Sequence, residues 1–307
     1  MARIRIILNM KAGRGKSGRI FPELAGHMQE LGLEYEVLVT QRQGHAIELA
    51  RQARLEGVPL VIAAGGDGTY HEVMNGLTEF GRVPYPVTAM GVVTTGSGCD
   101  FPRSIRMPRN DWRSAAQVIK EGKLRKVDIV KASYIGSSGS LESRAFLNAS
   151  NAGLTSETIL SAESFKVLGG KAGYLLAGIK TLFAYKNREV RLVVDGNEAF
   201  KGKAAVFTAG NGTYCGGGIM FTPKADPFDG LLDAVIIGDL NVWEVLKEIP
   251  RIYHGGHLEN PKVVSFRGRK MRLESKLPLY VEMDGELPGT LPVEYEVVPG
   301  ALQLLVP

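Results

Sequence analysis

The segment from Gly65 to Thr69 has the composition of a turn that binds phosphate. It follows the apolar run 60–64 and precedes a segment, 70–77, with apolar residues at helical spacing. Glycines in such a turn let the backbone approach phosphate oxygens, and the N-terminus of the following helix supplies N–H donors. Asp67 within the turn could orient a hydrated magnesium ion. A tight packing turn is the alternative, but open α/β sheets bind ligands at the ends of their strands.

Two further glycine-rich turns occur at comparable places in the chain. One, residues 13–18, carries Arg14 and Lys16 and comes shortly after Asn9, which ends the first apolar run. It lacks the spacing of a Walker A loop, and a solvated basic turn is an equally good interpretation of it. The other, residues 96–101, also follows an apolar run. Because the carboxyl ends of parallel strands meet at one edge of a sheet, the three turns together predict one shared site.

Acidic residues lie in two segments farther along the chain. Asp226, Asp229 and Asp233 surround Gly230, and residues 284–286 read Asp-Gly-Glu after an apolar run. A carboxylate at the end of a strand can accept the proton of an attacking alcohol. The alternative for Asp-Gly is an exposed hairpin turn, in which this dipeptide is common.

The elements that must position these turns alternate in the first part of the chain. The apolar runs 4–8, 35–39, 60–64, 87–92 and 127–130 are separated by segments with helical periodicity. Such alternation predicts a parallel sheet with crossover helices. After residue 130 the pattern changes to short alternating runs punctuated by glycine, which is typical of an antiparallel β domain.

The expected strands of the second part are 188–194, 204–208, 231–237, 263–266, 279–283, 293–298 and 302–306, with helical insertions at 157–185 and 241–249. The predicted fold class is α/β, with an N-terminal parallel-sheet three-layer nucleotide domain and a C-terminal antiparallel β-sandwich domain. We expect an α/β ATP-binding domain over 1–130, to which 299–307 can return. A β-sandwich lipid-substrate domain is expected over 131–298.

The composition is that of a folded enzyme. Of the chain's residues, 44% are hydrophobic and 22% are charged. Its length of 307 residues exceeds that of a usual single domain, roughly 100–200 residues. The net charge of +5 favours anionic partners only mildly, so we expect no nucleic-acid partner. Cys99 and Cys215 lack the spacing of a zinc site or a disulfide framework. We find no signal-peptide pattern and no membrane-spanning run, and expect a cytoplasmic protein with transient peripheral membrane association.

The ordered set of motifs resembles the diacylglycerol kinase catalytic family, which includes bacterial soluble lipid kinases and sphingosine kinases. The motifs are GGDGTYHEVMNGL at 65–77, GSGCDF at 96–101, DPFDGLLD at 226–233 and DGE at 284–286. The resemblance implies an ATP-dependent kinase that phosphorylates the hydroxyl of a lipid alcohol, of diacylglycerol type, in a cleft between two domains. ATP and Mg²⁺ are the implied co-substrate and cofactor, and a lipid at the membrane surface is the implied partner. A homodimer is left open.

By position in these motifs, the resemblance assigns a role to each candidate site residue. The implied nucleotide-binding residues are Asn9, Thr40, Gly65, Gly66, Asp67, Gly68, Thr69, Tyr70, His71, Gly96 and Ser97. The implied catalytic magnesium network is Asp67, Asp100 and Asp128, and the implied structural magnesium site is Asp226, Asp229 and Leu231. Glu286 would be the catalytic base that takes the proton of the lipid hydroxyl, with Asp284 beside it.

Two departures from the family pattern and two other functions are left open. Cys99 stands where an Asn is usual, and Met10 replaces a common proline, so we expect altered affinity but retained activity. A kinase of NAD type would share the GGDGT turn, but the DGE motif and residues 226–233 favour a lipid kinase. A catalytically inactive lipid-binding module would not need the intact acids Asp67 and Glu286. The sequence does not identify the lipid.

Overall fold

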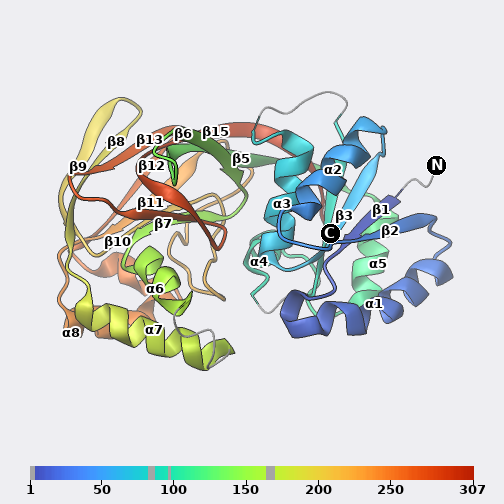
Figure 1. Cartoon of the computed structure of the whole chain (residues 1–307), viewed down its shortest axis with the longest axis horizontal. Helices are drawn as coiled ribbons and strands as arrows, with labels where there is room; N and C mark the ends of the chain where they lie inside the picture. Colours follow the sequence, from blue (N-terminus) through green and yellow to red (C-terminus); the bar gives the residue numbers. More distant parts are fainter. Residues whose placement is uncertain (1–3, 82–86, 96–97, 164–169) are drawn as a thin grey trace.

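The computed structural model describes residues 4–81, 87–95, 98–163 and 170–307, and the backbone alone for 163 and 170–176. Figure 1 shows two halves side by side, an α/β half and a β-rich half, joined by the long strands β5 and β15. The first half contains the strands β1 Ile4–Leu8, β2 Tyr35–Val39, β3 Leu60–Gly65 and β4 Ala89–Thr94, and the helices α1 Ala12–Glu30, α2 His45–Leu55, α3 Asp67–Thr78, α4 Asp100–Ser104 and α5 Trp112–Glu121.

The N-terminal half has the predicted three layers. Its strands lie in the order β4-β3-β1-β2 with parallel pairing throughout, so their carboxyl ends meet at one edge. Helices α2 and α3 pack against each other on one face, and α1 and α5 pack against each other on the other (Figure 1). Because helices cover both faces, an inner strand can be apolar on both sides, as in LVIAAG of β3, which is buried from Val61 onward.

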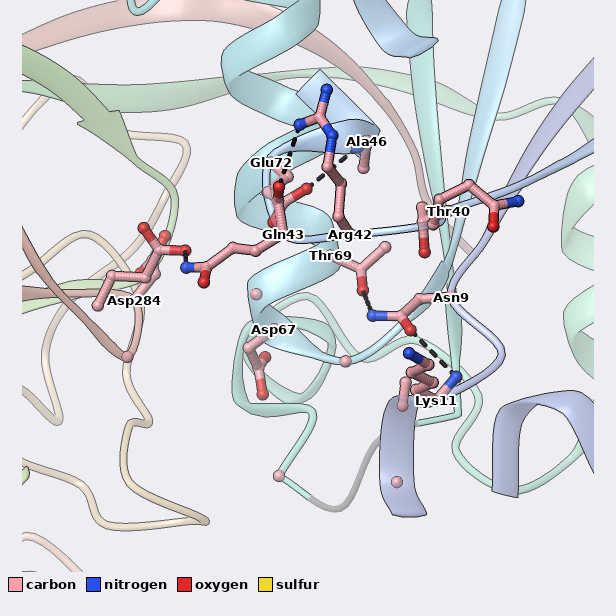
Figure 2. Close-up of a pocket in the computed structure, with 18 residues that line it drawn as sticks. Asn9, Lys11, Thr40, Arg42, Gln43, Ala46, Asp67, Thr69, Glu72 and Asp284 are labelled. Atoms are coloured by element: carbon pink, nitrogen blue, oxygen red, sulfur yellow. Dashed lines mark hydrogen bonds between the residues drawn. The ribbon is translucent and has the colours of Figure 1, made fainter. Parts of the chain in front are cut away.

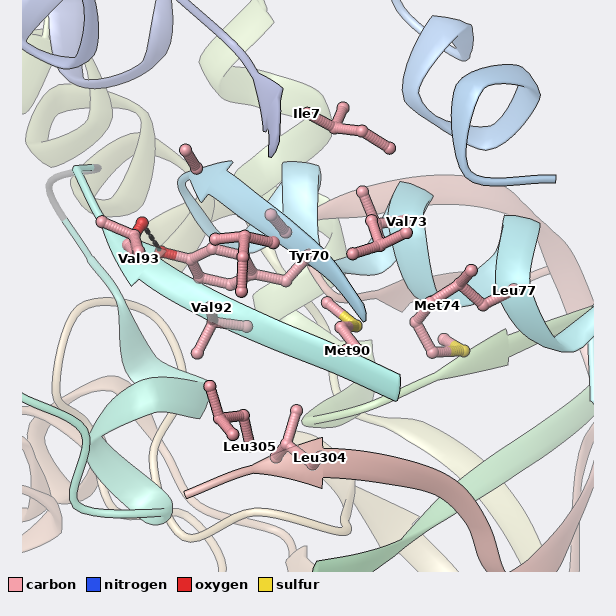
Figure 3. Packing of buried hydrophobic residues seen from close by; sticks show 14 of the residues in the cluster. Ile7, Tyr70, Val73, Met74, Leu77, Met90, Val92, Val93, Leu304 and Leu305 are labelled. Atoms are coloured by element: carbon pink, nitrogen blue, oxygen red, sulfur yellow. Dashed lines mark hydrogen bonds between the residues drawn. The ribbon is translucent and has the colours of Figure 1, made fainter. Parts of the chain in front are cut away.

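The core of this half also includes the last residues of the chain. Figure 3 shows Leu304 and Leu305 of β15 packed beside Met90 and Val92 of β4. Leu304 pairs with Met90 in a parallel register. The C-terminal end of β15 therefore lies beside β4 of the first sheet.

The C-terminal half is the predicted antiparallel sandwich. Its strands are β5 Leu124–Gly136, β6 Leu141–Phe146, β7 Ala149–Gly153, β8 Arg188–Val194, β9 Asn197–Ala204, β10 Val206–Gly210, β11 Leu232–Ile237, β12 Val263–Gly268, β13 Lys270–Ser275, β14 Tyr280–Met283 and β15 Glu286–Leu305. Its helices are α6 Leu154–Glu163, α7 Gly170–Ala184, α8 Val242–Ile252 and the 3-10 helix η2 Gly256–Glu259.

Strand β15 pairs with strands of both halves of the molecule. One sheet runs β12-β11-β10-β7-β14-β15, and a second pairs β15 with β5 and with β13, beyond which lie β8 and β9. A buried cluster fills the space between these sheets, and in it Tyr295 of β15 stacks on Phe207 at 6.0 Å and meets Phe146 edge-on at 5.9 Å. The described strands thus form one continuous sheet that folds on itself around β15.

Three of the predicted strands differ from the observed ones in extent or direction. The runs 293–298 and 302–306 belong to the single strand β15, which shifts register between Thr290 and Glu294 and between Val298 and Leu302. The run 127–130 belongs to the longer β5, which pairs antiparallel with β15 and is not part of the parallel sheet. Because β5 and β15 extend through both halves, the boundary at residue 130 stays a prediction.

Several C-terminal elements also differ from the expected ones. Strands β6, β7 and β13 were not anticipated, and the expected helix 157–185 is two helices, α6 and α7. The run 204–208 contains the end of β9 and the start of β10. Within the described part of the chain, none of the helices combines the length and the apolar character needed to cross a bilayer.

Candidate active site

A cleft of about 590 Å³ lies at the edge where the parallel strands end. Its walls come from the segments after β1, β2 and β3 on one side and from the turn between β14 and β15 on the other. The lining residues include Asn9, Lys11, Thr40, Arg42, Gln43, Gly66, Asp67, Gly68, Thr69, Glu72, Gly98, Asp284, Gly285 and Glu286. Figure 2 shows Asp284 facing the N-terminal residues across this cleft. Gly13 also lines the cleft, so residues of all three predicted glycine-rich turns meet there with the DGE motif.

The turn from Gly65 to Thr69 joins β3 to the N-terminus of α3 directly. Gly66 precedes the helix in an extended conformation, and the Thr69 N–H donates to the Gly66 carbonyl at 2.9 Å. A Cβ on Gly65 would lie 2.3 Å from Thr69 Oγ1, so only glycine fits there. A Cβ on Gly68 would meet nothing within 4 Å, so the backbone at this position is open to the cleft. The geometry is that of a helix N-terminus open to an anion.

Asn9 and Thr40 complete the same wall from neighbouring strands. Asn9 Nδ2 donates to Thr69 Oγ1 at 3.1 Å, and Asn9 Oδ1 accepts the Lys11 N–H at 3.1 Å (Figure 2). The Thr40 N–H donates to the Leu8 carbonyl at 3.0 Å, which holds the end of β2 beside β1. Both predicted residues line the cleft.

Tyr70 and His71 follow the turn but do not line the cleft. Tyr70 is 1% exposed, and its hydroxyl lies 2.8 Å from the Gly65 carbonyl and 3.2 Å from that of Val93 (Figure 3). The Tyr70 hydroxyl thus links the turn to β4 on the side of the hydrophobic core. The predicted Gly96 and Ser97 lie outside the described residues.

Asp67 lies on the cleft wall close to a second buried acid, Asp100. Asp67 Oδ1 accepts the N–H groups of Asp100 at 2.9 Å and Phe101 at 3.3 Å. Burial, together with the negative charges of Asp100 and Asp284, raises the pKa of Asp67 to about 6. Burial also raises the pKa of Asp100, against the Gly217 N–H that donates to its Oδ2 at 2.6 Å.

These two carboxyl groups fit a magnesium ion that arrives with a nucleotide. Asp100 Oδ1 is buried without a hydrogen-bond partner. The charges of Asp67 and Asp100 repel each other, and a bound cation would offset that repulsion. In the described part of the chain no three acidic, histidine or cysteine side chains converge as ligands of one metal ion. Mg²⁺ commonly uses one or two protein carboxylates and takes its other ligands from phosphate and water, and Asp67 and Asp100 could be those carboxylates.

Asp284 accepts more hydrogen bonds than the other acids that line the cleft. Its Oδ1 accepts the N–H groups of Asn148 and Ala149, both at 3.1 Å, and its Oδ2 accepts that of Leu147 at 2.9 Å. Oδ2 also lies 3.1 Å from Nδ1 of the buried His71. The turn itself is unusual, since Asp284 has φ 47° and Gly285 φ 93°. Asp284 is therefore fixed in place with both oxygens engaged.

Glu286, next along the turn, is held from its side and remains on the cleft wall. It is ion-paired with Arg144 of β6, and Gln43 Nε2 donates to its Oε1 at 3.3 Å. Gln43 belongs to the segment between β2 and α2, so this contact spans the cleft between the two halves. Of the two predicted catalytic acids, Glu286 is the one that can exchange these side-chain partners for a substrate hydroxyl.

Asp128 is placed apart from the cleft-lining residues. Its Oδ2 accepts the Gly230 N–H at 2.7 Å, and its Oδ1 accepts the Gly300 N–H at 2.6 Å. The side chain thus fastens the 226–233 segment and the bend of β15 onto β5. A role in the catalytic magnesium network stays a prediction for this residue.

The predicted structural magnesium site contains an arginine. Asp229 is ion-paired with Arg267, and its Oδ1 accepts the Leu231 N–H at 2.9 Å. Asp226 Oδ1 accepts the Phe228 N–H within the same loop at 3.1 Å. A cation bound to Asp229 would have to displace the Arg267 guanidinium, so this arrangement does not fit a resident metal ion. The assignment of Asp226, Asp229 and Leu231 stays a prediction.

Sequence reasoning missed several residues that the fold brings to the site. Arg42 and Gln43 follow β2 at the same sheet edge as the glycine turns, and that position was the available signal. Glu72, three residues after the GGDGT turn, accepts the N–H groups of Gly44 at 2.9 Å and Ala46 at 3.1 Å and so fixes the start of α2. Glu282 is fully buried below the DGE turn, and its Oε1 accepts the Gly285 N–H. No sequence pattern distinguishes Glu282 from an exposed strand residue.

Comparisons with known proteins agree with this geometry. Residues 3–132 match the family described as diacylglycerol kinase catalytic domain, and residues 149–306 match the YegS C-terminal NAD kinase beta sandwich-like domain. A diacylglycerol kinase of Staphylococcus carnosus is 31% identical, over 95% of this chain and 91% of its own. One of Bacillus subtilis is 28% identical, over 96% and 93%. A solved structure of a putative diacylglycerol kinase from Bacillus anthracis superposes with a TM-score of 0.76 at 26% identity, covering 99% of this chain and 97% of the other.

Proposed function

The chain belongs to the diacylglycerol kinase family and is a lipid kinase that uses ATP, and on that premise we propose how its own residues carry the reaction. The proposed reaction transfers the γ-phosphoryl group of ATP to the primary hydroxyl of a lipid of diacylglycerol type. The observation that carries this assignment is the meeting of Asp67 and the DGE turn, Asp284 to Glu286, across one cleft of about 590 Å³. In this proposal the wall that contains Asp67 binds the nucleotide phosphates, and the wall that contains the DGE turn binds the lipid hydroxyl.

The nucleotide phosphates bind at the N-terminus of α3. The exposed backbone at Gly66 and Gly68 offers N–H donors there, and the helix dipole favours the negative charge. Lys11 and Arg42 add positive charge on the same wall. These groups neutralise the phosphates and align the γ-phosphoryl group, which is most of what a protein contributes to phosphoryl transfer.

Asp67 and Asp100 would hold the Mg²⁺ that accompanies ATP. When bound, the ion would offset the charge that develops on the transferring phosphoryl oxygens. Burial is the main cause that raises the pKa of Asp67 to about 6, and the charge of Asp100 adds to it; a bound cation would offset that second contribution. Asp67 is then held for ion binding by the two N–H groups of α4.

Glu286 is the proposed catalytic base. It takes the proton of the lipid hydroxyl as that oxygen attacks the γ-phosphorus, and the bond from the γ-phosphorus to the bridging oxygen of ADP breaks. Asp284 is proposed as a positioning residue, because its oxygens already accept three backbone N–H groups and contact His71. The products are ADP and the lipid phosphate monoester, with the proton on Glu286.

The remaining parts of the proposal concern the surroundings of the substrate. A lipid with two acyl chains is met in a bilayer, so the enzyme associates transiently with the cytoplasmic membrane surface as a peripheral protein. We propose no nucleic-acid partner, and a homodimer as an assembly to be tested. The NAD-kinase alternative is not favoured, because residues 3–132, which include the GGDGT turn, match the diacylglycerol kinase catalytic domain.

Incubation of the purified protein with radiolabelled ATP, magnesium and a total lipid extract tests the proposal. We expect one labelled lipid that co-migrates with phosphatidic acid, and no labelled NADP when NAD replaces the lipid. Asp67→Ala should lose nearly all of this labelling, whereas Glu34→Ala, at an exposed acid between α1 and β2, should keep it. A labelled product other than phosphatidic acid would reject the diacylglycerol assignment while leaving the kinase assignment intact.

A further inference from the structure

Helix α8 carries a row of exposed apolar side chains along one side. Trp243 is 70% exposed, Leu246 38%, Ile249 45% and Tyr253, directly after the helix, 53%. Their spacing of three or four residues places them on one face of a helix. We call this row the α8 face. Figure 1 shows α8 at the lower outer edge of the C-terminal half.

The α8 face is not needed to hold the helix in place. On the opposite side, Ile252 is buried in a cluster with Val206 and Val235 of β10 and β11, and Val245 packs against that cluster. The first turn is fixed by a capping box between Asn241 and Glu244. Helix α8 is therefore anchored from the inside, while an apolar row that includes a tryptophan faces outward.

The charges of the helix also suit a negatively charged partner. Glu244 is paired with Lys262 at 2.6 Å, and the buried Glu248 accepts Asn260 Nδ2 at 2.8 Å. The exposed Lys247 lies next to Leu246 on the outside. In a two-fold contact between copies of this chain the α8 face would meet itself and bring Lys247 toward its own copy. An anionic surface would instead pair with Lys247.

A short segment links α8 to the candidate active site. The Met220 N–H donates to the Ile252 carbonyl at the end of α8 at 3.0 Å. His257 Nε2 lies 3.1 Å from the carbonyl of Phe221, the next residue. A few residues earlier, the Gly217 N–H donates to Asp100 Oδ2 at 2.6 Å. The same segment therefore contacts both the helix and the acid that we assign to magnesium.

We propose that the α8 face, comprising Trp243, Leu246, Ile249 and Tyr253, is the surface by which this kinase docks on a bilayer that contains anionic phospholipid. Tryptophan and tyrosine prefer the boundary between headgroups and acyl chains, and amphipathic helices lie in that layer with the apolar side down. Lys247 contacts the headgroups beside it. The inference rests on the proposed function, since it is there that the lipid substrate is met in a bilayer.

The test uses the fluorescence of the full-length protein. The chain has two tryptophans, and Trp112 is 7% exposed in the core, so a change on adding vesicles reports on Trp243. We expect a blue-shifted emission with vesicles of phosphatidylglycerol and phosphatidylcholine and little change with phosphatidylcholine alone. Leu246→Glu and Ile249→Glu should each weaken vesicle binding roughly tenfold, because each places a charge where the bound protein would have an apolar contact with the bilayer. Leu141→Glu is the matched control, since Leu141 is 73% exposed on β6, away from α8 in Figure 1.

Activity on two forms of substrate separates this inference from the proposed function. Leu246→Glu should lose activity on diacylglycerol embedded in vesicles but keep wild-type activity on a short-chain diacylglycerol dispersed in detergent. Unchanged Trp243 emission with vesicles, or vesicle binding equal in wild type and Leu246→Glu, would overturn the inference even if the kinase is active. A wild-type dimer that Leu246→Glu converts to a monomer, with vesicle binding unaltered, would assign the face to a second copy and also overturn it. Absence of any kinase activity, with the blue shift present, would reject the proposed function alone.

Discussion

His71 Nδ1 lies 3.1 Å from Asp284 Oδ2, which joins the first turn of α3 to the turn between β14 and β15. A second contact between the same halves lies one turn along the helix, where Asn75 exchanges two hydrogen bonds with the backbone of Ala145, at 2.9 and 3.1 Å. All of these groups are buried or nearly so. The phosphate-binding helix and the acceptor turn are therefore fixed relative to each other before any substrate binds.

Removal of the histidine should weaken this connection. His71→Ala leaves Asp284 without a side-chain partner in a buried place, so we expect the free energy of unfolding to fall by about 2 kcal/mol, as for other hydrogen bonds to buried charged groups. The kcat should also fall, because the DGE turn loses its side-chain contact with α3. His71→Asn, which retains a donor, should recover part of both. Chemical denaturation and steady-state kinetics measure the effects, with His27→Ala, a more exposed histidine on α1, as the control.

Glu282 should make the stability depend on pH. Burial raises its pKa from 4.5 to about 7, with a smaller contribution from the charge of Asp284, against hydrogen bonds from Asn151 and Gly285. Cys215 and Tyr295 also lie within its electrostatic reach. Between pH 4.5 and 7 the folded protein keeps the proton and the unfolded chain has lost it. Stability from this group is thus fully present below pH 4.5 and is lost as the pH rises through 7.

The comparison with Glu282→Gln isolates this group. The free energy of unfolding of the wild type, relative to that of Glu282→Gln, should decrease with rising pH by about 1.4 kcal/mol per pH unit within that interval. Denaturation in urea at several pH values provides the measurement. Parallel pH profiles for the two proteins would show that Glu282 is ionised in the fold, contrary to this expectation.

The two glycines of the phosphate turn should differ in what they contribute. A side chain at Gly65 would collide with Thr69, so Gly65→Ala should lower the free energy of unfolding by about 1–3 kcal/mol and reduce activity. A side chain at Gly68 meets nothing in the protein, so Gly68→Ala should keep the stability and lose affinity for ATP. Thermal unfolding and nucleotide titration separate the two effects. Equal destabilisation by both substitutions would argue against the open backbone at Gly68.

Asp128 offers a direct choice between a structural and a metal-related role. It accepts the N–H groups of Gly230 and Gly300, and loss of these two charged hydrogen bonds in Asp128→Ala should cost about 3 kcal/mol of unfolding free energy. The protein that remains folded should keep its magnesium dependence. If Asp128→Ala kept its stability but had no measurable kinase activity, Asp128 would instead belong to the magnesium network.

The sequence was sufficient where one segment determines its own structure. The apolar runs of β1 and β2 and the strand, glycine turn and helix from β3 to α3 depend on neighbouring residues, and they lie where the pattern predicts. Strand β15 was predicted as two strands, separated at Pro299 to Ala301. Pro299, and Pro292 before the first predicted strand, lie where the pairing of β15 with β5 shifts register. The antiparallel direction of β5 depends on this distant partner and has no local signal.

The same distinction applies to the candidate site. Glycine spacing and the DGE motif were enough to place Gly66, Asp67 and Glu286 on one cleft. Tyr70 was expected to contact nucleotide, but its hydroxyl has partners in β3 and β4, which only the packed sheet supplies. The ion pair between Glu286 and Arg144 joins residues far apart in sequence, and charge alone does not identify it.

The central claim is that Glu286 accepts the proton of a lipid hydroxyl while ATP is held by the opposite wall. The most direct measurement is the steady-state transfer of radiolabelled phosphate from ATP to dioctanoylglycerol by wild type, Glu286→Gln and, as a control, Glu142→Gln on the same strand as Arg144. We predict that Glu286→Gln lowers kcat at least a hundredfold, on the order expected for loss of a general base, with the KM for ATP within about threefold of wild type. Glu142→Gln should match the wild type. A kcat for Glu286→Gln within about threefold of wild type would contradict the assignment of Glu286 as the base.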